Sequence, residues 1–299
     1  MSERSVVVSL PDSVNEFQQL QIADAHQAAK RLGLQLEIRD ADGNAVLQIQ
    51  QLFKFVHAPE PPRALLVEPV AEVGMERVAQ KAAAAGIGFG LLNCTAPYVD
   101  GLRAQHPALA VFTLGSDQVE IGRLQGRQIR RLLPAGGTAL YLQGPLSASA
   151  ARERLQGAQE ALAGTGVETV VIDAMWTEDS AAAAVTKWLR MRTTEGQTID
   201  LVACQDDSMA MGALRAFREA PEITKRWSDV PFLGIDGLPG TGQRMVADGR
   251  LAATVVMPSN TGPALEAIDG WLRSGTPPQT AIRVPVRSYP PEEQLAPRR

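Results

Sequence analysis

The residues of this sequence that could do chemistry are acids and amides that follow short apolar runs. In the most informative stretch, Leu201-Val202-Ala203-Cys204 is followed directly by Gln205-Asp206-Asp207. Side chains that follow the apolar runs in this way are Asp12, Asn15, Glu68, Asn93, Gln143, Trp176, Gln205, Asp206 and Asp236. Carboxylates and amides bind hydroxyl groups in pairs, and an aromatic face covers the C–H side of a ring. The set therefore predicts a binding site for a neutral polyhydroxyl compound.

Catalytic alternatives have less support in the sequence. Asp206 and Asp207 could serve as acid and base, but adjacent residues at the start of a helix point in different directions. Cys94 could be a nucleophile, yet no histidine is placed by the sequence to activate it. The phosphate loop G-x-x-x-x-G-K-[ST] and the nucleophile elbow G-x-S-x-G are both missing from the sequence. Non-catalytic binding is predicted, with a sugar-modifying enzyme that uses Asp206 and Asp236 as the alternative.

Composition narrows the classes of partner. The chain has 299 residues and a formal net charge of −4, so no basic surface for nucleic acid is expected. Two cysteines and three histidines make a metal centre or a disulfide framework improbable. The longest nearly apolar run, residues 82–92, is too short to cross a bilayer. We expect no cofactor, no metal, no direct nucleic-acid partner and no membrane insertion.

The elements that must position these side chains alternate between short apolar runs and segments with helical periodicity. Strands are predicted at residues 6–10, 34–38, 64–67, 88–92, 109–114, 138–142, 167–172, 199–203, 231–234, 251–256 and 281–286. Right-handed crossovers between them give parallel sheets, with helices on both faces. Either Asp206 or Asp207 can cap the next helix, and two alternatives remain for the other acid: it is solvated, or it lies at the edge of the sheet where a ligand binds. Residues 219–229, with Trp227, are expected to form a surface insertion.

Four segments resemble a known family. They are Ser147-Ala148-Ser149-Ala150-Ala151-Arg152-Glu153-Arg154, the stretch from Gln205 to Leu214, Gly234-Ile235-Asp236-Gly237, and residues 248–255. Over nearly its whole length the chain resembles type I periplasmic binding proteins and the sugar-sensing domains of LacI-type repressors. The resemblance implies an α/β fold of two doubly wound parallel-sheet lobes joined by a three-segment hinge. The implied lobes are residues 1–115 plus 258–284 and residues 116–257 plus 285–299, with the ligand in a cleft between them.

The resemblance also implies a set of ligand contacts. Carried over by position, these are Asn15, Phe17, Gln18, Glu68, Asn93, Arg154, Trp176, Asp206 and Asp236. The chain departs from the family at Asn93-Cys94, where Asp-Arg is common, and at Met257, where glutamine is common. The first loop, Glu16-Phe17-Gln18, lacks one of the usual stacking rings. These departures imply a less polar pocket, so a modified sugar, a deoxy-sugar or a cyclitol is as good a candidate as a simple pentose or hexose.

Two roles follow from the resemblance. One is the solute-binding component of an ABC transporter, with a permease as partner, and the other is a ligand sensor with a signalling partner. Met1-Ser2-Glu3-Arg4 leads straight into the first strand, which predicts a cytoplasmic protein as written, or a periplasmic one if the sequence is a trimmed mature form. Only four residues precede that strand, so a full repressor with a helix-turn-helix is not expected. A cytoplasmic co-regulatory protein without a DNA-binding domain remains the alternative.

Overall fold

The described chain consists of two compact units, each with its own sheet. The computed structural model describes residues 4–94, 96–191, 198–227 and 229–297. Unit 1 comprises Met1–Ser116, Ser147–Ser149 and Ser259–Val284, and unit 2 comprises Asp117–Leu146, Ala150–Pro258 and Pro285–Arg299. Each unit is described by itself below.

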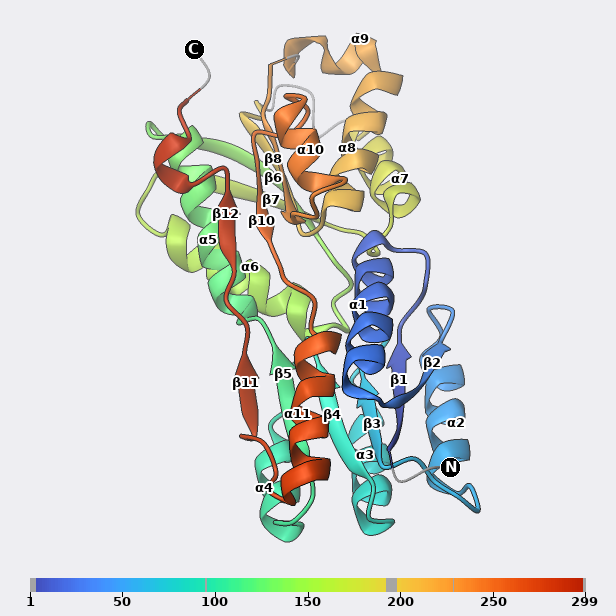
Figure 1. Ribbon diagram of the computed structural model, residues 1–299. Coiled ribbons are helices and arrows are strands. Elements are labelled where there is room, and N and C mark those ends of the chain that lie inside the picture. The colour runs from blue at the N-terminus through green and yellow to red at the C-terminus, as the bar shows by residue number, and fades with distance from the viewer. Residues whose placement is uncertain (1–3, 95, 192–197, 228, 298–299) are drawn as a thin grey trace. The chain divides into compact units, whose positions relative to one another are not determined.

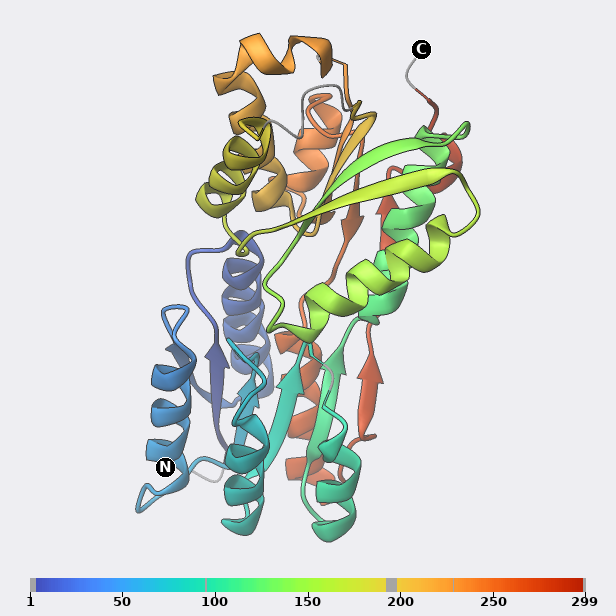
Figure 2. The ribbon, with the colours of Figure 1, turned by 180° about the vertical axis from the view of Figure 1, so that it is seen from behind.

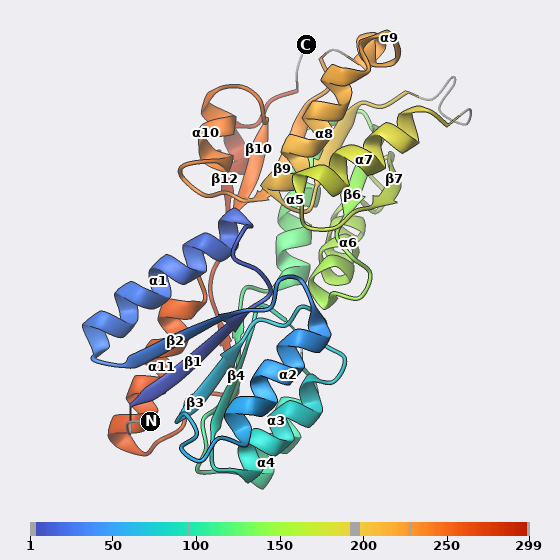
Figure 3. The same ribbon diagram turned by 90° about the vertical axis from the view of Figure 1, so that its right-hand side faces the viewer.

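Unit 1 is built on a six-stranded parallel sheet with strand order β11-β5-β4-β3-β1-β2. Its strands are β1 (Ser5–Leu10), β2 (Gln35–Asp40), β3 (Ala64–Val67), β4 (Gly88–Leu92), β5 (Val111–Gly115) and β11 (Ala281–Arg283). Helices α1 (Glu16–Leu32) and α11 (Thr261–Ser274) cover one face of the sheet (Figure 1). Helices α2 (Ala45–Val56), α3 (Met75–Ala84) and α4 (Tyr98–Gln105) cover the other (Figure 3).

Strand β1 shows why the apolar runs of this chain do not alternate with polar residues. All six of its residues are buried. Val6 and Val8 pack into the cluster formed with α1 and α11, whereas Val7 packs into the cluster formed with α2 and α3. Successive side chains of a strand point to opposite faces, so a strand covered on both faces needs a continuous apolar run.

Unit 2 has a second six-stranded sheet, with strand order β12-β10-β9-β8-β6-β7. Its strands are β6 (Gly137–Gln143), β7 (Val167–Asp173), β8 (Leu201–Cys204), β9 (Phe232–Asp236), β10 (Ala253–Val256) and β12 (Arg287–Tyr289). Helices α5 (Gln118–Leu132) and α6 (Ser149–Leu162) cover one face (Figure 2). Helices α7 (Glu178–Leu189), α8 (Asp207–Glu219) and α10 (Gly242–Ala247) pack on the other, and α9 (Pro221–Thr224) follows α8. All strands run parallel except the edge strand β12, which is antiparallel to β10.

The predicted fold class is confirmed, with differences in three elements. The predicted strand 281–286 ends at Arg283, and β12 begins beyond it in the other unit; Pro285 has no N–H group, which breaks the run. Helix α4 was not predicted, because its eight residues bury only Val99 and Leu102 and so show little periodicity. The third difference is the predicted surface insertion at residues 219–229.

Trp227 is a core residue of unit 2 and not part of a surface insertion. The side chain is 5% exposed, and its ring centroid lies 5.7 Å from that of Trp188, in a stacked arrangement. Phe217, at the end of α8, contacts the same ring at 6.0 Å. The expectation failed because a single aromatic residue among charged neighbours gives no periodic signal in the sequence.

Candidate functional site

Each sheet has one point where the order of strands reverses. In unit 1 this point lies between β1 and β3, and in unit 2 between β6 and β8. The helices after the two neighbouring strands turn to opposite faces there, which leaves room at the carboxyl ends of the strands; this is where open α/β sheets bind ligands. The predicted site residues of each unit gather near these two points, and we describe them as the unit 1 site and the unit 2 site.

Glu68 is the centre of the unit 1 site. It directly follows β3 and is 8% exposed. Its Oε1 accepts hydrogen bonds from Gln18 Nε2 and Asn93 Nδ2, both at 3.1 Å, and its Oε2 accepts one from Gln21 Nε2 at 2.9 Å. The main chain is held as well, since Gln48 Nε2 donates to the Glu68 carbonyl oxygen at 2.9 Å. Thus three of the predicted residues, Gln18, Glu68 and Asn93, meet in one cluster.

The surroundings of Glu68 disfavour a negative charge. Burial is the largest influence and raises the pKa of this carboxyl above its ordinary value. The hydrogen bonds from Gln21, Asn93 and Gln18 act in the opposite direction, while the nearby Asp12 raises the pKa further. Among the described residues no lysine, arginine or histidine forms an ion pair with Glu68. The net result is a carboxyl group that holds its proton more tightly than an exposed glutamate does.

Gln21 is a site residue that the sequence did not single out. Its side chain is fully buried, and its Oε1 accepts hydrogen bonds from Ser259 Oγ and Asn260 N, both at 2.7 Å, at the start of α11. Gln21 therefore joins the Glu68 carboxylate to the segment that leads back into unit 1. The available signal was its spacing, since residues i and i+3 of a helix lie on one face and Gln18 was already a candidate.

Asn15 and Phe17 lie at the start of α1, as expected for the loop after β1. Asn15 is the N-cap, and its side-chain oxygen accepts a hydrogen bond from Phe17 N at 2.8 Å. Phe17 is 5% exposed and belongs to the buried side of the helix. The cap fixes the direction in which the chain enters α1, and with it the position of Gln18 one residue further on.

Arg154 and Trp176 meet in the unit 2 site. Arg154 extends from α6 and is 4% exposed. Its Nε donates to Gln118 Oε1 at 2.8 Å and its Nη1 to the Gln205 carbonyl oxygen at 2.6 Å, while Nη2 lies 3.2 Å from Met257 Sδ. The guanidinium carbon is 5.5 Å from the centroid of the Trp176 ring, within the range of a cation–π contact. Arginine and indole thus hold each other in place.

The Trp176 ring rests against the loop that follows β6. A Cβ atom placed on Gly144 would lie 2.2 Å from a carbon of this ring, so glycine is required there. Gln205 secures the same loop, because its Oε1 accepts a hydrogen bond from Gly144 N at 2.9 Å. Its Nε2 donates to the Ala151 carbonyl oxygen at 2.9 Å. Gln205 is fully buried and acts as a structural support for the site.

Asp206 and Asp207 have separate functions. Asp206 is the N-cap of α8, and its Oδ1 accepts a hydrogen bond from Met209 N. Asp207 is 2% exposed; its Oδ1 accepts from Thr254 Oγ1 and its Oδ2 from Gly237 N, each at 2.8 Å. The alternative in which one of the two acids is solvated is therefore wrong. Asp207 is buried and accepts hydrogen bonds from Thr254 in β10 and from Gly237, just after β9.

Asp236 completes the predicted residues of unit 2. It ends β9, is 7% exposed and has a φ of +105°, which is rare for a residue with a side chain. Its carbonyl oxygen accepts a hydrogen bond from Met257 N at 3.0 Å. Met257 thereby contacts both Asp236 and Arg154, and Gln205 connects Arg154 to the neighbouring Asp206. The structure therefore brings Arg154, Trp176, Asp206 and Asp236 into one connected region of unit 2.

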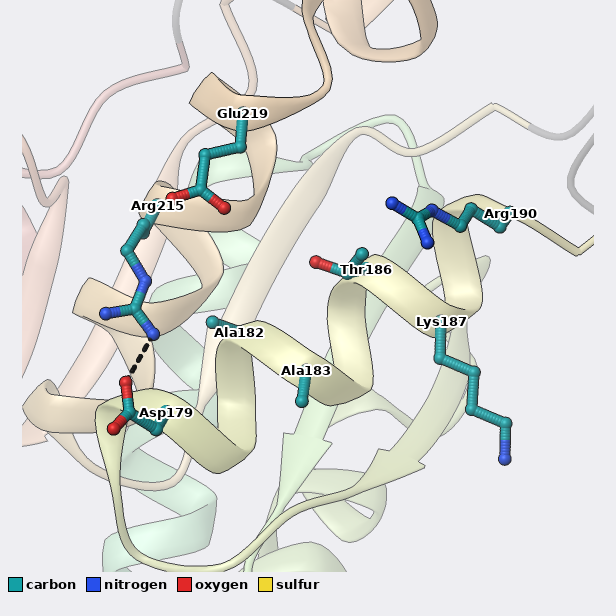
Figure 4. A pocket seen from close by; sticks show the side chains of 8 residues that line it. All are labelled: Asp179, Ala182, Ala183, Thr186, Lys187, Arg190, Arg215 and Glu219. Carbon is teal, nitrogen blue, oxygen red and sulfur yellow. Dashed lines mark hydrogen bonds and ion pairs between the residues drawn. The ribbon is translucent and has the colours of Figure 1, made fainter.

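A groove on the surface of unit 2 contains none of the predicted residues. It lies between α7 and α8, as Figure 4 shows. Arg215 reaches across it, with Nη2 2.6 Å from Asp179 Oδ1 and Nη1 2.9 Å from Glu178 Oε1. These are exposed ion pairs, which contribute little to stability. Because the groove contains none of the predicted residues, the carboxyl ends of the two sheets remain the candidate site.

The described residues also bear on metal binding and on membrane insertion. Within them, no group of three or more histidine, cysteine, aspartate or glutamate side chains is arranged to hold a metal ion. No helix of the described ranges is long and apolar enough to cross a membrane. Cys204 is fully buried in the core of unit 2, and burial raises the pKa of its thiol.

Comparison with known proteins identifies relatives of both the sequence and the fold. Residues 6–261 match the family model described as periplasmic binding protein domain. A Rhizobium meliloti protein named for rhizopine binding is 32% identical over 192 residues, which cover 63% of this chain and 59% of that protein. The ribose import binding protein of Escherichia coli K12 is 28% identical over 239 residues, covering 80% of this chain and 74% of the relative. This chain thus spans about three fifths to three quarters of these relatives.

Solved structures share this fold. A galactofuranose binding protein superposes with a TM-score of 0.84 at 24% identity, covering 95% of this chain and 94% of that one. At this level of identity the match concerns the fold alone.

Proposed function

This chain belongs to the periplasmic binding protein domain family, and on that premise we propose that it binds a small polyhydroxyl ligand, a sugar or a sugar-like compound, without catalysis. The unit 1 and unit 2 sites each supply part of the binding site, and the units close on the ligand by hinge bending. Three connections between the long parts of the units, after Ser116, Pro258 and Val284, support a hinge of three segments, and Ser147–Ser149 adds a short excursion of the chain into unit 1.

The observation that carries this proposal is the pair of matching sites at the strand-order reversals. Each presents hydrogen-bonding groups at the carboxyl ends of neighbouring parallel strands. Asn93 and Glu68 in unit 1, and Asp206 with Asp236 in unit 2, have the donors and acceptors that hydroxyl groups require. Trp176 adds an aromatic face held by Arg154, suited to the apolar side of a ring.

We propose delivery of the ligand to an ABC transporter permease as the biological role. The relatives support this role by their names, one of which is a ribose import binding protein. These relatives are binding proteins, and this agrees with a protein that does not transform its ligand. A periplasmic location follows from the same role.

The test is a thermal-shift screen against sugars, cyclitols and polyols, followed by calorimetric titration of each compound that raises the melting temperature. A ligand present at 100 times its Kd stabilises the folded state by roughly 2.7 kcal/mol. Asp206→Asn should keep the helix cap, because asparagine caps as well as aspartate, yet weaken binding by about 10- to 100-fold through loss of a charge-assisted hydrogen bond.

Asp117→Asn is the matched control. Asp117 is the N-cap of α5, and its Oδ1 accepts a hydrogen bond from Glu120 N at 3.0 Å. This variant should bind as the wild type does. The proposal fails if no compound of these classes stabilises the protein, or if one is converted to a product during titration.

A further inference from the structure

The unit 1 site contains a buried carboxylate whose hydrogen-bond partners are all neutral. Gln18, Gln21 and Asn93 each donate one hydrogen bond to Glu68. The nearby charge that acts on it is Asp12, which is also an acid, and within the described residues no cationic side chain pairs with it. Burying a carboxylate away from water is costly unless an opposite charge accompanies it or it takes up a proton.

Gln18 provides a second, independent observation. The residue is 6% exposed, and while its Nε2 donates to Glu68, its Oε1 is buried without a hydrogen-bond partner among the described residues. Buried polar atoms are normally paired, so an acceptor that lacks a donor needs an explanation. This acceptor belongs to the amide group that donates to the carboxylate, so Gln18 and Glu68, which are in contact, define one spot that carries both the amide oxygen and the carboxylate.

We propose that this spot binds a protonated amine of the ligand, so that the ligand is a polyhydroxyl compound with an amino substituent, such as an aminodeoxy-sugar or an amino-cyclitol. The inference rests on the proposed function and specifies its ligand class. An ammonium group has three donors and no acceptor. It can donate to the remaining acceptor position of the Glu68 carboxylate and to Gln18 Oε1, and it supplies the missing positive charge.

A hydroxyl group fits this spot less well than an ammonium group does. It could donate one hydrogen bond, but it would leave the carboxylate without a counter-charge. The nearby Asp12 is also an acid, so it adds negative charge next to Glu68 and increases the need for a positive group there. The amine therefore accounts for both observations, the buried carboxylate and the acceptor that lacks a donor.

The experiment compares three forms of each compound by calorimetric titration at pH 7. The panel consists of aminodeoxyhexoses and inosamines, each beside its parent hydroxyl compound and its N-acetyl derivative, which retains the nitrogen but not the charge. For the best-bound amine we expect affinity at least about 30-fold higher than for either neutral form, as a desolvated charge pair typically provides. Wild-type protein alone suffices for this comparison.

Glu68→Gln gives the second part of the test. It should weaken binding of the amine by a factor at least about 30 times larger than the factor by which it weakens binding of the neutral parent. Glu76→Gln, which removes an exposed carboxylate on α3 of the same unit, should change neither. Circular dichroism melting confirms that each variant is folded.

The outcomes separate this inference from the proposed function. Binding of neutral parents as tightly as amines, with no specific effect of Glu68→Gln on the amine, would overturn the inference and leave the proposed function intact. An absence of binding across all three forms would overturn the proposed function, and the inference with it.

Discussion

At the scale of single residues, Glu68 is the side chain whose surroundings are most unusual. Its three amide partners come from two helical positions and one strand end, and none carries a charge. Burial raises the pKa of this carboxyl, so the folded chain binds its proton more tightly than the unfolded chain does. The stability of the protein must therefore depend on pH through this group.

We predict that Glu68→Gln increases the stability of the ligand-free protein at pH 8 by about 1 to 3 kcal/mol, because it removes the cost of burying a charge. The pKa of Glu68 is raised on folding, so its contribution to stability is fully present below the ordinary glutamate pKa and is lost as the pH rises through the folded value. The advantage of the variant should accordingly shrink as the pH falls toward 4. Urea unfolding at several pH values measures it.

The amide groups can adapt to this substitution. Gln21 must continue to donate, since its oxygen accepts from Ser259 and Asn260. Gln18 can reverse its amide, because its oxygen has no hydrogen-bond partner to lose within the part of the chain that the structure describes. Glu76→Gln, on the surface, serves as the control. Equal destabilisation by Glu68→Gln at pH 4 and pH 8 would contradict the prediction.

The positions of the site residues along the chain could be predicted, but their contacts could not. Polar residues after apolar runs identified Glu68, Asp206 and Asp236, because strand ends are visible in the sequence. Asp206 caps a helix whereas Asp207 accepts hydrogen bonds from Thr254 and Gly237, which are distant in sequence and are brought close by the fold. No local pattern contains that information, and for the same reason the role of Gln205 as a support was not foreseen.

At the scale of elements, the crossing of α5 and α6 sets the position of Arg154. The two helices approach so closely that a Cβ on Gly122 would lie 2.0 Å from the Arg154 carbonyl oxygen, and one on Gly157 would lie 1.9 Å from that of Val119. Both glycines are therefore required by the contact between the helices. This packing fixes the backbone of Arg154, and with it the position from which the side chain carries the guanidinium group into the unit 2 site.

Gly122→Ala should destabilise the protein by about 2 kcal/mol or more, because the helices must separate to admit one methyl group. Ligand binding should weaken as well, since Arg154 moves with α6. Gly270→Ala is the control: it lies in α11, and a Cβ there would meet nothing within 4 Å. The control should gain up to about 1 kcal/mol from the better helix propensity of alanine. Similar melting temperatures for both variants would refute this account.

Most elements were predictable from the sequence, including the four-residue strands β3, β8 and β10, and the exceptions are the short elements α4 and β12. Every strand of five residues or more gave an apolar run that was recognised, with ends displaced by one or two residues. Helix α4 buries only Val99 and Leu102, and strand β12 has three residues, of which only Ser288 is buried. Strand β12 pairs with β10 because the chain re-enters unit 2 at Pro285. The three residues of β12 carry no pattern that predicts this pairing.

At the scale of the whole molecule, the chain contains two units that each have a complete core. In unit 1 the sheet lies between two buried clusters, and the same is true of unit 2. The long parts of the units are connected after Ser116, Pro258 and Val284, and the chain also enters unit 1 briefly at Ser147–Ser149. Units of this kind can move as rigid bodies while a few linking residues change their backbone angles.

We predict that a saturating ligand lowers the radius of gyration of the protein in solution, because the proposed hinge closes. Small-angle X-ray scattering with and without the ligand measures the change. Asp206→Asn at the same ligand concentration, below its own Kd, should retain the larger value. An unchanged radius at full occupancy of the wild type would argue against closure and leave binding itself unaffected.

The placement of the tryptophans gives the protein its own optical reporters. Trp271 lies in α11 of unit 1, where its indole N–H donates to the Ala108 carbonyl oxygen at 3.0 Å. Trp188 and Trp227 stack in the core of unit 2, and Trp176 packs against the Arg154 guanidinium. Emission from Trp271 can therefore follow the unfolding of one unit and emission from the stacked pair that of the other. Trp176 would report binding of the proposed ligand. Variants that keep only Trp271, only the Trp188–Trp227 pair, or only Trp176 would therefore give three separate fluorescence signals.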